Sequence, residues 1–153
     1  MSIQIHPLMP QDQPEVLAVA RTLAAWFRPL DQMALAIDLR EQEGLVALEN
    51  NQVVGFLTHH MVGERAELSW LGVLPEKQDR GIGSLLLATL EQLLLERSVL
   101  WLQLSTVPAD HDVTFVGTNA FYQRHGFTVR QRDDNFYAHG RPRILLEKML
   151  SPP

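Results

Sequence analysis

Apolar residues along the chain recur at two spacings, one typical of helices and one typical of strands. At the helical spacing, the sequence predicts a first helix that starts at Asp12-x-x-Glu15, with Pro14 in its first turn, and that Pro29 ends. A second helix is expected over residues 33–42 and closes near Gly44.

Two more helices are predicted in the second half of the chain. One starts at Ile82, and its leucines give it a single broad buried face. The other is short, covers residues 118–125 and is followed by Gly126, which suits the C′ position that ends a helix.

The strands are predicted from apolar alternation between turn residues. In one of them, Leu100, Leu102 and Leu104 share a face, and turns are expected at 49–52 and 63–65. The seven predicted strands cover residues 2–7, 45–48, 53–61, 67–74, 99–107, 127–131 and 144–149. The order β-α-α-β-β-β-α-β-α-β-β indicates a mixed α+β fold, and 153 residues are enough for one domain, residues 1–153, with a proper core.

The most informative segment, residues 71–87, places a polar loop between an apolar strand and a helix that opens with Gly81 and Gly83. The first N–H groups of a helix have no internal partner, and the helix dipole places partial positive charge there. Glycines at that end let a ligand approach the backbone. The segment therefore predicts a seat for a phosphate or pyrophosphate.

Two common phosphate-binding patterns do not fit this segment. A dinucleotide fingerprint needs G-x-G-x-x-G, and its third glycine position is Leu86 here. A P-loop needs a Gly-Lys pair, and the chain has none. What remains is Gln78-x-x-Gly81-x-Gly83, in which the glycines alone would also suit a simple tight turn.

A second segment, Asn119-Ala-Phe-Tyr-Gln-Arg-His-Gly-Phe127, decides between these readings. With the glycine loop, it resembles the two motifs of the GNAT N-acetyltransferase superfamily, Q/R-x-x-G-x-G/A and N-x-x-[F/Y]-Y-x-x-x-G-F, in the family's order. The resemblance extends from about Gly44 to Met149. It implies the GNAT fold, a mostly antiparallel twisted sheet flanked by helices and splayed between its fourth and fifth strands.

The resemblance also implies acetyl-CoA as cosubstrate. Its pantetheine arm would lie along the strand that holds Leu71, Gly72 and Val73, where a backbone N–H would face the thioester oxygen and Gly72 would suit a bulge. Asn119 would either bond the pantetheine arm or cap the short helix, and Arg80 could pair with the pyrophosphate. The residues expected to supply pyrophosphate donors are Gln78, Asp79, Arg80, Gly81, Ile82, Gly83 and Ser84.

Two residues are candidates for the chemistry. A tyrosine hydroxyl is protonated at pH 7, so Tyr122 can donate to the leaving thiolate, the part its position plays in the family; the alternative is a buried structural tyrosine. Glu67 precedes the loop where some family members carry a catalytic glutamate, so it is the candidate base, acting through water or after burial; the alternative is a solvated charge beside Arg65. Deprotonating an alkylamine at pH 7 costs roughly 4–5 kcal/mol, which explains the need for a base.

Composition excludes several other classes. With no cysteine there is no disulfide, thiolate metal site or cysteine nucleophile, so transfer is expected to be direct, in a ternary complex. His59-His60 and His111-Asp112 lack the usual zinc spacing, so no metal is expected. A net charge of −5 argues against nucleic acid as the main partner. The longest apolar stretch is too short for a membrane span. No positively charged, apolar leader is visible, which favours the cytoplasm.

The acceptor is the least readable part. The segments 28–42 and 133–143 are expected to select it, and Trp26, Phe27, Trp70 and Phe136 would either line its pocket or pack in the core. The sequence thus predicts an N-acetyltransferase for a small-molecule or peptide amine, with a non-catalytic acyl-CoA-binding domain as the alternative. The exposed late strands also suggest a homodimer.

Overall fold

The computed structural model describes residues 2–137 and 140–151. They form a seven-stranded sheet in the order β1-β2-β3-β4-β5-β7-β6, antiparallel throughout except between β4 and β5. The strands are β1 (Gln4–Pro7), β2 (Glu43–Glu49), β3 (Gln52–Val62), β4 (Arg65–Val73), β5 (Trp101–Thr106), β6 (Thr128–Asp133) and β7 (Arg143–Met149). The helices are α1 (Gln13–Thr22), α2 (Pro29–Glu41), α3 (Ile82–Glu96) and α4 (Val116–Arg124). The predicted element order and the mixed α+β class are confirmed.

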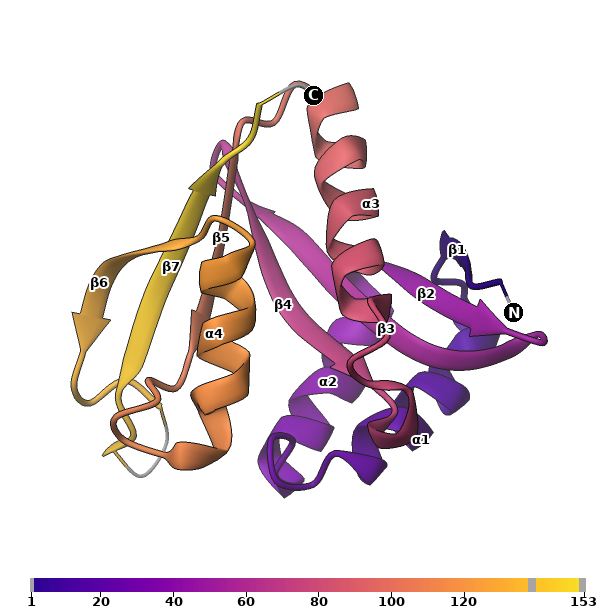
Figure 1. The fold of residues 1–153 in the computed structure, drawn as a ribbon, viewed down its shortest axis with the longest axis horizontal. Coiled ribbons are helices and arrows are strands. Elements are labelled where there is room, and N and C mark those ends of the chain that lie inside the picture. The colour runs from indigo at the N-terminus through magenta and orange to yellow at the C-terminus, as the bar shows by residue number, and fades with distance from the viewer. Residues whose placement is uncertain (1, 138–139, 152–153) are drawn as a thin grey trace.

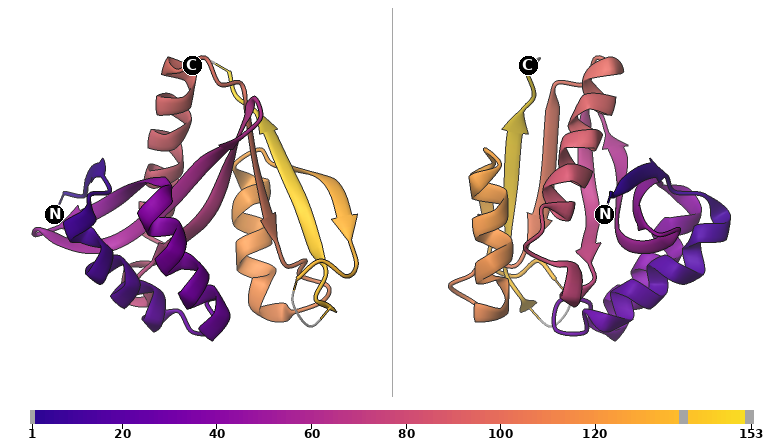
Figure 2. Two further views of the ribbon diagram at one scale, coloured as in Figure 1. Left: turned by 180° about the vertical axis from the view of Figure 1, so that it is seen from behind. Right: turned by 45° about the vertical axis from the view of Figure 1, so that its right-hand side comes forward.

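The helices cover opposite faces of the sheet (Figures 1 and 2). α1 and α2 pack on β2 and β3 around a core that includes Leu35, Val46 and Phe56. α3 covers the other face, where its leucines meet β2, β4 and β5, and this larger core extends to Tyr122 of α4. α1 and α3 therefore each bury an apolar face against the sheet, as their spacing predicted.

The first two helices differ from the prediction in their limits. α1 ends at Thr22, and Pro29 does not end it but starts α2. Proline suits the first position of a helix because the N–H that it lacks has no partner there. Gly44 does not close α2 either, since it lies inside β2, where a side chain would come within 2.6 Å of the Leu57 carbonyl oxygen.

The fourth helix also starts earlier than expected, at Val116 rather than Thr118, because the chain enters it through a short 3-10 turn, Val113–Phe115. The Asp112 side chain accepts a hydrogen bond from the Thr114 N–H at 3.0 Å and so begins that turn. The predicted turn at 49–52 is confirmed, with Asn50 and Asn51 both at positive φ, as the two-residue turn between β2 and β3 requires.

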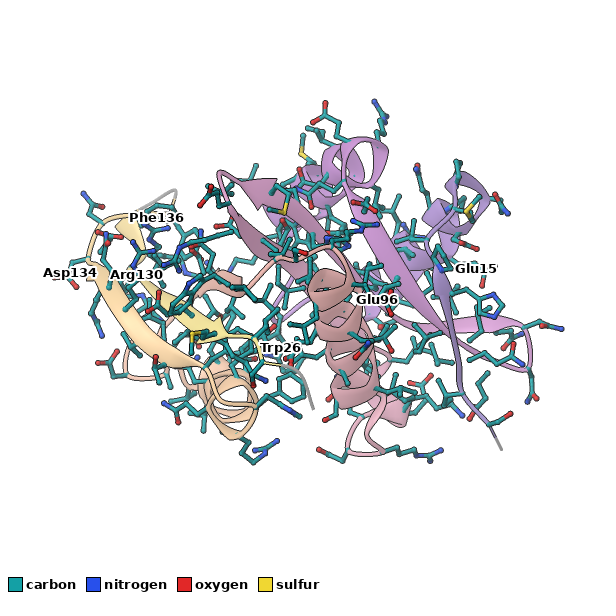
Figure 3. The ribbon with its side chains drawn as sticks, turned by 90° about the horizontal axis from the view of Figure 1, so that it is seen from above. Glu15, Trp26, Glu96, Arg130, Asp134 and Phe136 are labelled. Atoms are coloured by element: carbon teal, nitrogen blue, oxygen red, sulfur yellow. The ribbon has the colours of Figure 1, made fainter. Side chains whose placement is uncertain are left out.

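None of the described helices is both long enough and apolar enough to span a membrane. Seen from above, the chain spreads along one direction: Glu15 of α1 lies at one end, and Arg130, Asp134 and Phe136, from β6 and the turn after it, lie at the other (Figure 3). The sheet joins the two ends through β4 and β5, and the site lies where those two strands part.

Candidate active site

The sheet opens between its two parallel strands. β4 and β5 are paired only at Ala66 with Leu102 and at Glu67 with Gln103. Beyond these pairs the strands diverge, which gives the sheet the V shape seen in Figure 1. A cavity of about 1160 Å³ occupies the opening. The predicted splay between the fourth and fifth strands is confirmed.

The other edge of β4 stays paired with β3 along its whole length. One register shift interrupts this pairing, where Thr58 lies opposite Trp70 and His59 opposite Leu68, so Ser69 has no partner on β3. The irregularity is therefore at Ser69 and not at Gly72, which pairs regularly with Phe56. Gly72 is needed for a different reason: a Cβ there would lie 2.9 Å from the Phe56 ring and 3.0 Å from Leu23.

The loop from β4 to α3 contains two left-handed residues and leads into a helix with no side-chain cap. Asp79 and Gly81 have φ of +61° and +83°, and Gly81 is the N-cap of α3. No side chain caps this helix, and its first turn carries no acidic residue. The Gln78 side chain donates to the Val73 carbonyl at 3.0 Å and so ties the loop back to the strand. The first N–H groups of α3 therefore have neither an intrahelical acceptor nor a side-chain cap.

Most of the predicted cofactor residues line the cavity. They are Leu71, Gly72, Val73, Gln78, Asp79, Gly81, Ile82, Gly83, Ser84 and Tyr122. Ser84 lies in the first turn of α3, and its Oγ is 2.9 Å from Nε2 of His125 at the end of α4. Arg80 is exposed and is not among the lining residues. Its charge instead helps Lys77 to lower the pKa of the Glu49 carboxyl.

Asn119 does not cap α4, and its side-chain amide bonds to the backbone of the loop after β5. Its Oδ1 accepts from the Ala109 N–H at 2.9 Å, and its Nδ2 donates to the Val107 carbonyl at 3.1 Å. It cannot cap α4, which starts three residues earlier, and it is not among the residues that line the cavity. Its amide holds the loop after β5 in place.

Tyr122 reaches the cavity from α4. Its side chain is 6% exposed, packed edge to face against Phe121 and Phe127. Burial raises the pKa of its phenol well above the usual value near 10. The hydroxyl has no hydrogen bond to any other described residue, although buried tyrosines usually find a partner. The Tyr122 hydroxyl is therefore protonated and free to donate its hydrogen bond into the cavity.

Glu67 lies at the closed end of the V, where it also lines the cavity. Its Oε1 accepts from Gln103 Nε2 at 2.9 Å, and its Oε2 lies 3.6 Å from His60 Nε2. Arg65, expected beside it, instead pairs with Glu147 at 2.9 Å and stacks on Trp101. The Glu67 carboxylate thus has no arginine partner and remains one quarter exposed to the cavity.

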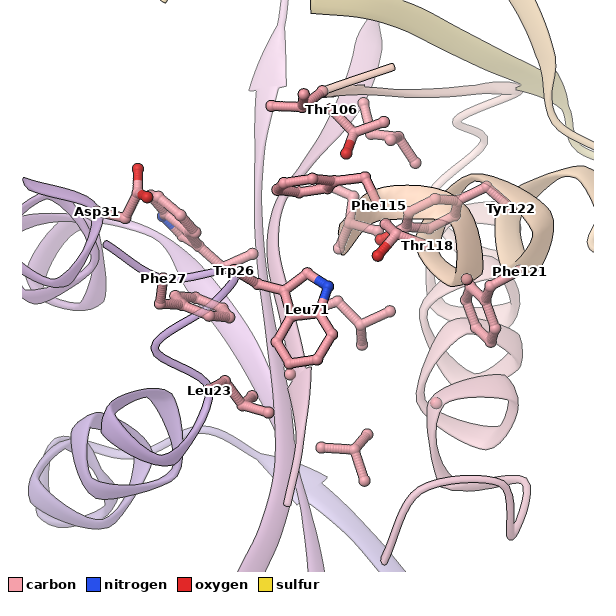
Figure 4. A pocket seen from close by; sticks show the side chains of 18 of the residues that line it. Leu23, Trp26, Phe27, Asp31, Leu71, Thr106, Phe115, Thr118, Phe121 and Tyr122 are labelled. Atoms are coloured by element: carbon pink, nitrogen blue, oxygen red, sulfur yellow. The ribbon is translucent and has the colours of Figure 1, made fainter. Parts of the chain in front are cut away.

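Side chains from two distant segments form the rest of the cavity (Figure 4). Leu23, Trp26 and Phe27 form one wall, and Phe115 and Thr118 belong to the opposite one. Trp26 spans the gap, since its Nε1 donates to the Thr114 carbonyl at 3.0 Å. Of the aromatic residues predicted for the acceptor, Trp26, Phe27 and Trp70 line the cavity, whereas Phe136 lies outside it, under Arg143.

Between β6 and β7 the sequence singled out Phe136, yet it is Tyr137 and Arg141 that line the cavity. The pKa of Tyr137 is raised to about 12, mainly by burial; the Asp31 and Glu67 carboxylates add to this effect, and the Arg143 and Arg141 charges oppose it. The sequence indicated Tyr137 and Arg141 only as members of the predicted acceptor segment, residues 133–143, which is polar and aromatic. Residues 138–139 of that segment lie outside the described part. Within that part, no group of three or more histidine, aspartate or glutamate residues could hold a metal ion.

Comparison with known proteins gives one family match. Residues 40–129 match the model of the acetyltransferase (GNAT) domain. A GNAT-family protein from Desulfovibrio desulfuricans superposes with a TM-score of 0.87 at 20% identity, covering 98% of this chain and 100% of its own. The ribosomal-protein-S18-alanine N-acetyltransferase of Escherichia coli gives 0.81 at 22% identity over 99% of this chain and 96% of its own. The PaiA N-acetyltransferase of Thermoplasma acidophilum, solved with coenzyme A, gives 0.76 at 20% identity over 97% and 99%.

Proposed function

Because the chain belongs to the GNAT acetyltransferase family, we propose that it transfers the acetyl group of acetyl-CoA directly to a primary amine in a ternary complex. The observation that supports this most is that the Tyr122 hydroxyl, the Glu67 carboxylate and the uncapped start of α3 all face one cavity. A binding module would need only the last of these. The two side chains supply the acid and the base that transfer from a thioester to an amine requires.

Acetyl-CoA would bind along the opened edge of β4. The N–H groups at the start of α3 would take the pyrophosphate, with the Ser84 hydroxyl beside them. The edge of Leu71–Val73 that faces β5 has no strand partner and would take the pantetheine arm, with an N–H directed at the thioester oxygen. A hydrogen bond of this kind stabilises the tetrahedral oxyanion more than the ground-state carbonyl.

The amine would enter from the side of Trp26, Phe27 and Tyr137. Glu67 would take a proton from the ammonium, directly or through a water, and the free amine would attack the carbonyl carbon. Tyr122 would then give its proton to the departing thiolate. A tyrosine suits that step because its raised pKa keeps it protonated until the sulfur develops charge.

The competing function is a domain that binds an acyl-CoA without turning it over. The two differ in one measurement: thiol release from acetyl-CoA over a panel of amines that includes polyamines, amino acids and peptides with free N-termini. The proposal expects amine-dependent thiol release together with the acetylated product by mass spectrometry. Tight binding of acetyl-CoA with no product from any amine would favour the binding domain.

The choice between a small-molecule amine and a peptide amine belongs to the same panel. The cytoplasm as compartment, a homodimer, and the absence of nucleic acid and membrane partners stay predictions from the sequence. Size-exclusion chromatography with light scattering would decide the homodimer directly.

A further inference from the structure

A continuous line of polar side chains crosses the closed end of the V. Ser69 Oγ lies 3.0 Å from His60 Nδ1, and His60 Nε2 lies 3.6 Å from Glu67 Oε2. The other Glu67 oxygen accepts from Gln103 Nε2 at 2.9 Å. The line therefore runs from β4 to β3, back to β4 and on to β5.

The strand register brings these groups together. His60 on β3 lies directly opposite Glu67 on β4, and Glu67 in turn lies opposite Gln103 on β5. Side chains at directly opposite positions share a face of the sheet, so all three are neighbours. The register shift leaves Ser69 without a partner on β3, and its hydroxyl turns to the His60 ring instead.

The two ends of the line have different surroundings. Glu67 and Ser69 line the cavity, whereas His60 does not. The His60 side chain is nonetheless 36% exposed, so its ring touches both the carboxylate and the outside solvent. His60 is thus placed as a bridge between the cavity and the solvent behind it.

We propose that His60 relays to solvent the proton that Glu67 removes from the acceptor amine, with Ser69 fixing the ring; this rests on the proposed function, in which Glu67 is the base. In the first step an N–H bond of the ammonium breaks and an O–H bond forms on Glu67. In the second step that O–H bond breaks as an N–H bond forms at His60 Nε2. The imidazolium then loses its Nε2 proton to a solvent water, so His60 returns to its Nδ1–H form and Glu67 is a carboxylate again for the next turnover.

The direction of transfer follows from ordinary chemistry. An imidazole is a stronger base than a carboxylate, so a proton on a carboxylic acid moves downhill to a neutral ring within reach. The separation of 3.6 Å is just outside hydrogen-bond distance, and catalytic hydrogen bonds are often long without substrate and shorten in the complex. The relay requires one tautomer, in which Nδ1–H donates to Ser69 Oγ and the lone pair of Nε2 faces Glu67.

Other titratable groups near the relay are few among the described residues. Glu67 faces the ring from β4, and His59 precedes it on β3, where burial and, to a lesser extent, the neighbouring His60 lower the pKa of His59. Tyr137, from the β6–β7 connection, is near enough for the Glu67 charge to add to the rise in its pKa, and its phenol stays neutral at pH 7. Arg65, the nearest arginine on β4, is held away by Glu147. Glu67 is therefore the group whose proton His60 can receive.

The test compares His60→Gln with His111→Gln, a histidine exposed in the loop after β5 and outside the cavity. The relay predicts that kcat falls about 10-fold or more in His60→Gln, with the KM for acetyl-CoA unchanged and a shifted acid limb in the pH profile. His111→Gln should keep wild-type kinetics. In His60→Ala, added imidazole should restore turnover as its free-base form increases. A wild-type kcat and pH profile in His60→Gln would overturn the relay, and so would a loss that imidazole does not relieve.

A second measurement needs no turnover. Nitrogen NMR of the ring at neutral pH should find the proton of His60 on Nδ1 in the wild-type protein, and the preference should weaken in Ser69→Ala. A proton on Nε2 would overturn the relay. Glu67→Gln separates the two proposals: full activity there refutes the base, whereas a loss in Glu67→Gln with none in His60→Gln refutes the relay alone.

Discussion

The two ends of the cavity are built from different parts of the chain. The N-termini of two helices illustrate this difference. At α2, the side chain of Asp31 in the first turn accepts from the Arg28 N–H at 3.0 Å. At α3, no side chain caps the helix and the first turn has no acidic residue. At the α3 end of the cavity, backbone N–H groups have no side-chain partner. At the other end, next to α2, the wall of the cavity is formed by side chains such as those of Trp26, Phe27 and Tyr137. Backbone groups are the same in every sequence, so an end of the cavity built from them can bind the same cofactor in many different proteins. An end built from side chains changes with the sequence and so selects one acceptor.

The largest expected effect is on kcat, and it distinguishes the two tyrosines of the chain. Tyr122 lies at the cofactor end of the cavity and Tyr137 at the acceptor end. Tyr122→Phe should lower kcat by roughly 10²-fold or more, because general acid catalysis is typically worth 10²–10⁴-fold, and should leave the KM for acetyl-CoA nearly unchanged. Tyr137→Phe is the matched change and should alter mainly the KM for the amine. Steady-state kinetics with both substrates varied would measure this, and wild-type turnover in Tyr122→Phe would contradict it.

A smaller effect is expected from the backbone of the cofactor end. Gly81→Ala forces a side chain into the left-handed region, which costs about 1–2 kcal/mol. If the loop shifts to relieve this strain, the affinity for acetyl-CoA should fall about 5- to 30-fold, by the same factor for every amine. Calorimetric titration with coenzyme A would measure the affinity.

Gly63→Ala is the control for that variant. Gly63 also has a positive φ with open space around it, but it lies in the turn between β3 and β4, away from the cavity. It should lose similar stability and keep full affinity for coenzyme A. Equal losses of affinity in both variants would show that strain in general, rather than the seat at α3, is responsible.

Trp26→Phe tests the acceptor end with a change of a few-fold. The variant keeps an aromatic ring but loses the hydrogen bond from Nε1 to the Thr114 carbonyl, worth about 1 kcal/mol. We expect kcat/KM for the amine to change about 3- to 5-fold and the KM for acetyl-CoA to stay the same. Trp101→Phe, outside the cavity, is the control, and an effect confined to acetyl-CoA would reverse the assignment of the two ends.

The smallest expected effect concerns the ionisation of the two tyrosines, which should both stay largely protonated at pH 10. Burial raises the pKa of Tyr137 to about 12 and that of Tyr122 further, so Tyr137 should titrate first. Because both values lie above that of the unfolded chain, the unfolded state loses these protons first, and stability falls as the pH rises above about 10. Tyrosinate absorbance of the two Tyr→Phe variants would give the order; a folded protein with ordinary titration near 10 would contradict it.

The same division explains what the sequence could reveal. The element order and the glycine loop were predicted because apolar spacing and glycine positions report backbone geometry directly. The splay between β4 and β5 was predicted only from the resemblance to the GNAT superfamily. The limits of α2 were wrong since Pro29 can start a helix as well as end one. Local spacing did not distinguish these two uses.

The acceptor end was less readable because its contacts join segments far apart in the chain. Trp26 meets Thr114 across 88 positions, and neither residue belongs to a local pattern. Tyr137 becomes part of the cavity only when the β6–β7 connection folds toward it. Asn119 fits the family motif by position, yet its partners Val107 and Ala109 are visible only in three dimensions. Predicted roles for Tyr122 and Glu67 agree with their placement but await the kinetics above.

The splay between β4 and β5 also bears on the tendency of the protein to aggregate. Two unpaired strand edges facing one opening form a template for any extended chain, which is the usual starting point of aggregation. An amide-bearing arm lying between them would occupy both edges at once, and a ligand that binds only the folded state also stabilises it. The supply of cosubstrate would then govern the solubility and turnover of the protein as well as its reaction rate.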